Sequence, residues 1–124
     1  MGVPKRNRQW LREIQGAYKR AAKMVARGEV SNLDTHQIAP RLAAKERQFD
    51  DPVEIETMVD AAIASVEWEA SVDEEARGRY KFHFVSSYVF AHVHMGHLEE
   101  LEADRLMDYI NESWDLFDEY ETAI

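Results

Sequence analysis

Residues 80–98 form the most apolar run in an otherwise highly charged chain. They include five of the ten Phe and Tyr residues of the protein and four of its five histidines. A chain of 124 residues can bury enough surface to fold without disulfides, and this chain has no cysteine to form them. We therefore expect a single domain over residues 1–124, with residues 1–6 frayed and residues 80–98 at its centre.

Two secondary structures compete for this central run. Its alternating aromatic residues would suit a β-hairpin over residues 80–95 that turns at Ser86 and Ser87. Such a turn, however, would lack the Gly, Asn or Asp of a tight hairpin. A capping-box pattern at residues 71–74 and a terminating Gly96 instead delimit one helix of about 24 residues. We predict this helix, because a central helix is apolar nearly all round, and keep the hairpin as the alternative.

Two helices are predicted before residue 50. Residues 7–27 carry an apolar stripe at helical spacing, and Gly28 stands where a helix would end. Residues 35–48 form the second helix, which either kinks at Pro40 or begins there, because proline is unfavourable inside a helix. The expected core anchors of this second helix are Leu42 and Phe49.

Two more helices are predicted on either side of the central one. Asp51, Pro52 and Glu54 are the residue types of an N-cap, a first turn and a capping box, so a third helix begins there. Trp68 either extends the apolar stripe of this helix or lies on the surface. The last helix covers about residues 99–121. Its expected apolar contacts are Leu98, Leu101, Leu106, Ile110, Trp114 and Phe117. The sequence therefore predicts an all-α bundle of about five helices.

Charge is divided unevenly along the chain. Residues 1–47 hold eleven Lys and Arg against four acids, whereas residues 48–124 hold four against twenty. The net charge of −9 thus conceals a basic first part and a strongly acidic second part. This asymmetry indicates either a charged partner or a basic first helix that packs beside the acidic last one. Direct nucleic-acid binding by the first helix is not favoured, because the acidic part would repel phosphates.

The histidines of the central run do not predict a metal site. On a helix, His92 and His94 point about 200° apart and cannot share an ion. His94 and His97 have a workable spacing, but Gly96 is expected to end the helix between them. We therefore expect no metal and no cofactor.

A short segment around the start of the central run suggests catalysis. The spacing of Arg77 and His83 resembles the Arg-x4–6-His signature of HEPN-type helical ribonucleases. The resemblance covers seven residues. It implies that His83 would act as general base and that Arg77 would stabilise charge on the cleaved phosphate. The alternative is a basic helical turn that contains an ordinary histidine, and in that interpretation the chain has no catalytic residue.

The last predicted helix is unusually acidic. Between residues 99 and 121, ten carboxylates accompany a single base, Arg105. The carboxylates are Glu99, Glu100, Glu102, Asp104, Asp108, Glu112, Asp115, Asp118, Glu119 and Glu121. Such a ridge can dock a basic protein by fast, salt-sensitive association, or present charges as an array of phosphates does. In this character the chain is similar to small phage-borne inhibitors of restriction and CRISPR systems and to immunity proteins against toxic nucleases.

The resulting hypothesis is a binding protein without catalytic activity. Its acidic C-terminal surface would act as a DNA mimic and occlude a basic site on a nucleic-acid-handling protein. One alternative is a HEPN-like ribonuclease or its inactive relative, and the other is a structural homodimer whose basic and acidic faces pair. We expect a cytoplasmic protein with no membrane contact, because the start of the chain has no signal-like apolar segment and no run is long enough to span a bilayer.

Overall fold

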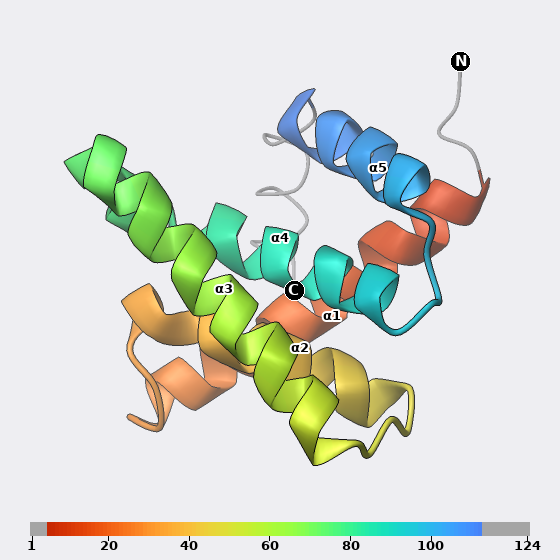
Figure 1. The fold of residues 1–124 in the computed structure, drawn as a ribbon, viewed down its shortest axis with the longest axis horizontal. Helices are drawn as coiled ribbons and strands as arrows, with labels where there is room; N and C mark the ends of the chain where they lie inside the picture. Colours follow the sequence, from red (N-terminus) through yellow and green to blue (C-terminus); the bar gives the residue numbers. More distant parts are fainter. Residues whose placement is uncertain (1–4, 113–124) are drawn as a thin grey trace.

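The computed structural model describes residues 5–112, with side chains from residue 8 onward, as a bundle of five α-helices (Figure 1). The α-helices are α1 Lys5–Ala26, α2 Thr35–Glu46, α3 Pro52–Val72, α4 Tyr80–His94 and α5 Glu100–Glu112, and the two short 3-10 helices are η1 Asn32–Asp34 and η2 Glu74–Gly78. Residues 5–112 contain no strand. The predicted all-α bundle is therefore confirmed, and the alternative hairpin over residues 80–95 is wrong.

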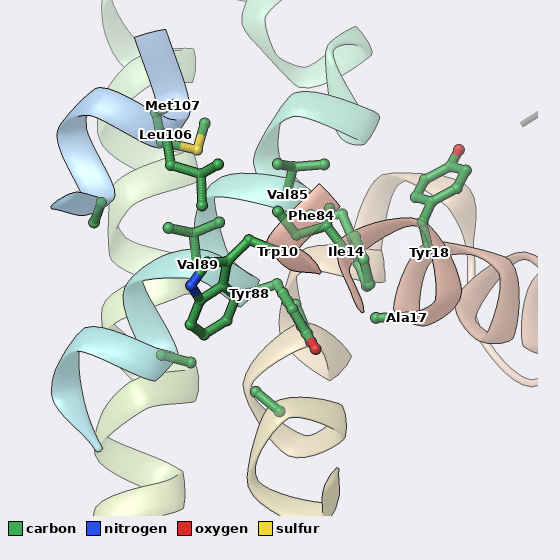
Figure 2. Packing of buried hydrophobic residues seen from close by; sticks show 14 of the residues in the cluster. Trp10, Ile14, Ala17, Tyr18, Phe84, Val85, Tyr88, Val89, Leu106 and Met107 are labelled. Carbon is green, nitrogen blue, oxygen red and sulfur yellow. The ribbon is translucent and has the colours of Figure 1, made fainter. Parts of the chain in front are cut away.

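The helix α4 lies at the centre of the bundle, and each of the other four helices contacts it (Figure 1). Four of its side chains, Phe84, Val85, Tyr88 and Val89, are completely buried. Figure 2 shows side chains of α1 and α5 packed around them. These contacts explain why α4 is apolar on almost every side: most of the helix surface meets a neighbouring helix, which removes apolar surface from water.

The helix α2 packs on the core through small side chains. Ala39, Ala43 and Ala44 are buried, whereas Leu42 and Phe49 are only partly buried and lie against the edge of the core. The prediction that these two large residues anchor α2 is therefore correct only in part, because small residues bring the helix backbones close together. The helix begins at Thr35 and continues through Pro40, so the prediction that it begins at the proline is wrong.

Three helices end at a residue with positive φ. These residues are Gly28 (76°), Gln48 (55°) and Gly96 (82°). After α4, the Gly96 N–H donates to the Val93 carbonyl (3.0 Å) and the His97 N–H donates to the His92 carbonyl (2.9 Å). This pair of bonds is a Schellman cap, and the same pair follows α1 and α2. The sequence correctly predicts the caps at the two glycines, whereas Gln48 gives no such signal.

The start of α3 is formed as the sequence predicts, but the start of α4 is not. The Asp51 carboxylate accepts hydrogen bonds from the N–H groups of Val53 (3.1 Å) and Glu54 (3.2 Å). The predicted helix from residue 71 onward is wrong, because Asp73 caps η2 and α4 begins only at Tyr80. The extended backbone at Asp73 and the helix-disfavouring Gly78 explain the break between α3 and α4.

The helix α5 faces the core with only part of its predicted apolar set. Ala103, Leu106, Met107 and Ile110 are buried. Leu101 is 59% exposed, so the prediction that it contacts the core is wrong. It lies on the side of α5 that faces solvent. Trp114, Phe117 and the predicted end of this helix lie outside the described residues.

The cap at Gln48 generates a stability prediction. A residue with a Cβ is strained at positive φ, whereas glycine is not, so Gln48→Gly should raise the free energy of unfolding by about 1 kcal/mol. The reverse change, Gly96→Ala, should lower it by about the same amount, because an added Cβ meets no atom within 4 Å and only the backbone strain remains. Urea unfolding measures both, and a destabilised Gln48→Gly variant would contradict this explanation of the cap.

Candidate functional site

The helix α3 is apolar on its outer side as well as on its buried side. Toward the core it buries Met58, Val59, Ala62 and Val66. On the outer side, six exposed residues recur every three or four positions and therefore share one face. We call this surface the α3 face; it consists of Val53, Thr57, Ala61, Ala64, Trp68 and Val72. Its three largest apolar side chains are Val53, Trp68 and Val72, which are 72%, 67% and 69% exposed.

A groove of about 280 Å³ runs beside the α3 face, between α3 and α4. Small side chains of α3, including Thr57, Ala61 and Ser65, form one wall. The other wall includes Phe90 and His94 of α4, and Phe90 is itself partly exposed. Because Thr57 and Ala61 belong to both surfaces, the α3 face and the groove are continuous. Together they form one continuous exposed surface with apolar side chains from both α3 and α4.

The charge around this surface is negative. Residues 52–72 contain five acids and no Lys or Arg. Glu54 lies 2.5 Å from His94 at the end of the groove, and Glu56 lies 2.5 Å from Arg41 of α2. Asp60 and Glu67 are exposed and form no ion pair within residues 8–112. The α3 face is thus bordered by carboxylates, of which two have no nearby cation in the described part of the chain.

The predicted carboxylate ridge lies on α5 and on the residue before it. Glu99, Glu100, Asp104, Asp108 and Glu112 are exposed, and Glu102 is half-buried. Four of these carboxylates, at positions 100, 104, 108 and 112, follow one another every four residues and so lie about 6 Å apart along one face. None of these four forms an ion pair with a residue in the described range. Asp115, Asp118, Glu119 and Glu121 lie outside the described residues.

The structure places Arg77 and His83 in neighbouring elements, but it buries the histidine. Arg77 lies exposed in η2, whereas His83 is only 4% exposed. The His83 Nε2 lies 2.7 Å from the Ala76 carbonyl oxygen, so this nitrogen donates, and Nδ1 lies 3.6 Å from the Glu69 carboxylate. The ring therefore ties η2 to α4. To act as the general base of a ribonuclease, it would have to leave this position.

A polar network inside the bundle gives no separate signal in the sequence. The buried Tyr88 hydroxyl of α4 donates to the Glu46 carboxylate of α2, which also accepts from Arg20 of α1. Burial, together with the Glu13 carboxylate, raises the pKa of Tyr88 and keeps the hydroxyl protonated. Three helices are joined at this point, so the network has a structural role.

His92 is a second buried polar group of α4. Its ring is fully buried and makes edge contacts with Trp10 (4.9 Å between centroids) and Tyr88 (4.8 Å). Neither ring nitrogen has a hydrogen-bond partner within the described range. Burial, assisted by the positive charge of Arg47 and by His97, lowers the pKa of His92 to about 4. His92 is therefore neutral at pH 7.

The described residues contain no group of three or more His, Asp or Glu placed to hold a metal ion. None of the helices within residues 5–112 combines the length and the apolar character of a membrane span. No family model matches the chain, and neither a curated protein sequence nor a solved structure gives a significant match.

The burial of His92 predicts a loss of stability in acid. Because its folded pKa lies below the unfolded value of 6.5, the unfolded chain binds the proton more readily, and stability falls as the pH drops from 6.5 toward 4. The full shift corresponds to roughly 3 kcal/mol. Burial also lowers the pKa of His36, which adds to the same trend. Urea unfolding at about pH 7 and about pH 4.5 measures this loss.

A variant isolates the contribution of His92. The change His92→Met removes the titrating ring and should reduce the acid loss by roughly 2–3 kcal/mol. An unchanged pH dependence in His92→Met would show that His92 is not responsible.

Proposed function

We propose that this protein is a non-catalytic binding module that receives a partner protein on the α3 face and the adjoining α3–α4 groove. The observation that carries the proposal is the exposure of Val53, Trp68 and Val72 on one side of a single helix. A contiguous exposed apolar surface costs free energy in water, and on folded proteins it marks a site of interaction. Tryptophan is also enriched among the residues that dominate binding energies.

The position of the face supports this proposal. The remaining helices direct most of their described apolar residues toward the core, whereas α3 presents apolar residues both inward and outward. A helix that is apolar all round is normally covered on all sides. The groove adds a concave border lined by small and hydroxyl side chains, into which a partner side chain can insert. A docked protein would bury the apolar side chains of α3 that the described residues leave exposed.

The proposal predicts which substitutions abolish partner binding. Trp68→Asp and Ala61→Arg place a charge on the α3 face and should weaken binding at least about tenfold. Both residues are exposed, so the free energy of unfolding should change by less than about 0.5–1 kcal/mol. Leu101→Asp is the control, since Leu101 is similarly exposed but lies on α5.

The measurement uses a partner captured from the native host by the wild-type protein and then titrated against each variant. Binding by Leu101→Asp should equal that of the wild type. Equal affinity for the wild type and both α3 variants would contradict docking on this face. If the α3 variants still bind the partner and Leu101→Asp does not, the binding site lies on α5 instead.

A second candidate function rests on the carboxylate row of α5. Like charges four residues apart destabilise a helix by about 0.2–0.5 kcal/mol per pair, and this row contains three such pairs in succession. A basic partner surface would relieve that repulsion. In this candidate, the protein inhibits a nucleic-acid-handling partner by occupying its phosphate-binding site, as a DNA mimic of the anti-restriction or anti-CRISPR type would.

Charge reversal separates the second candidate from the first. Asp104→Lys with Asp108→Lys should weaken binding at least about tenfold at low salt, and the difference should shrink as salt increases. The matched control is Asp50→Lys with Glu74→Lys. It changes the net charge by the same amount at two exposed positions outside α5. Equal affinities for the two double variants would count against occlusion by α5.

A further inference from the structure

The α3 face is long enough and regular enough to pack against another helix. From Val53 to Val72 it follows one straight element, and at 1.5 Å per residue it is about 28 Å long. The centre of the face carries the small residues Ala61 and Ala64, whereas large apolar side chains stand near its ends. A helix laid along the face can therefore approach the α3 backbone closely at the middle and contact Val53 and Trp68 near its ends.

The charges at the border of the face select the partner. Asp60 and Glu67 lie along one edge with Glu56, and all three are exposed. Glu56 is paired with Arg41 of α2, whereas Asp60 and Glu67 form no ion pair with a described residue, and α3 itself contains no Lys or Arg. A docked helix would bring its own flanking side chains against this edge. Lysine or arginine at those flanks would gain attraction, and glutamate or aspartate would be repelled.

The same charges argue against a second copy of this chain as the occupant. Self-pairing through the α3 face would bring the exposed Asp60 and Glu67 of one copy toward those of the other, and neither α3 offers a Lys or Arg. The basic residues of the first helix, such as Arg12 and Lys19, lie on its exposed side, but the apolar residues of that helix, such as Trp10 and Ile14, are buried in the core. The helix α1 of a second copy therefore has no apolar stripe to offer.

We propose that the α3 face binds an amphipathic helix whose apolar side chains recur every three or four residues and whose flanks carry lysine or arginine. This inference rests on the proposed function and adds the class of partner to it. Recognition of this kind lays the apolar stripe of a partner helix in a groove and uses the flanking charges for orientation and rate of association.

Two labelled peptides of about 20 residues test the proposal. Both carry leucine at helical spacing; one has lysine at the flanking positions and the other has glutamate. Fluorescence anisotropy with the full-length protein should give a dissociation constant at least about tenfold lower for the lysine peptide. Its affinity should fall as salt increases, because the flanking pairs are exposed.

Three variants establish where the lysine peptide binds. Ala61→Gln fills the groove without a charge and should weaken binding about tenfold. Asp60→Lys with Glu67→Lys should do the same, whereas Asp104→Lys with Asp108→Lys, which makes the same net charge change on α5, should alter it less than about twofold. Circular dichroism of each variant confirms that the fold is retained.

Three outcomes would overturn the proposal. These are equal affinity for the two peptides, equal weakening by the α3 and α5 charge variants, and self-association of the wild type that Trp68→Asp abolishes. If neither peptide binds while the natural partner still loses affinity for Trp68→Asp, the class of partner is wrong and the docking surface of the proposed function stands. If the natural partner also binds Trp68→Asp with unchanged affinity, both proposals fail.

Discussion

The burial of Phe84 and Tyr88 on α4 is the constraint on which the rest of the structure depends. A helix enclosed on several sides requires an apolar or small surface from every neighbour. The helices α1 and α5 supply large side chains, whereas α2 supplies alanines that allow close approach. These three helices turn most of their described apolar residues inward, whereas α3 also carries an exposed apolar side. The central packing therefore leaves the outer side of α3 exposed to solvent.

Polar groups inside this packing determine how the helices are aligned. The Tyr88 hydroxyl meets the Glu46 carboxylate, and Arg20 completes the contact from α1. A shift of α4 by one residue would turn Tyr88 away from Glu46 and leave a buried hydroxyl without a partner, which costs about 1–3 kcal/mol. His83 has a similar role at the other end, where it ties η2 to α4 through the Ala76 carbonyl. The histidine that resembled a catalytic base by spacing alone is thus part of the scaffold.

Local signals predicted most of the fold, and tertiary packing decided the rest. Gly28, Gly96 and the Asp51 cap marked helix ends because their roles depend on nearby backbone atoms. The sequence does not show that α3 leaves one of its two apolar sides uncovered, because the exposure of Trp68 depends on where the other helices pack. The burial of His83 was equally hidden, since its spacing from Arg77 is the same whether the ring is exposed or enclosed. Five of the ten predicted carboxylates are exposed on or just before α5, and their function remains a prediction.

In the proposed function the partner binds the α3 face between its bordering carboxylates, and the carboxylate row of α5 is a separate charged surface. A photoreactive phenylalanine analogue can be placed at position 64, in the middle of the α3 face, and separately at position 108 on α5, since both native residues are exposed. Irradiation in the native host followed by mass spectrometry identifies what each position touches. We predict a crosslink from position 64 to a lysine- or arginine-rich helical segment of a partner. A crosslink from position 108 with none from position 64 would contradict it.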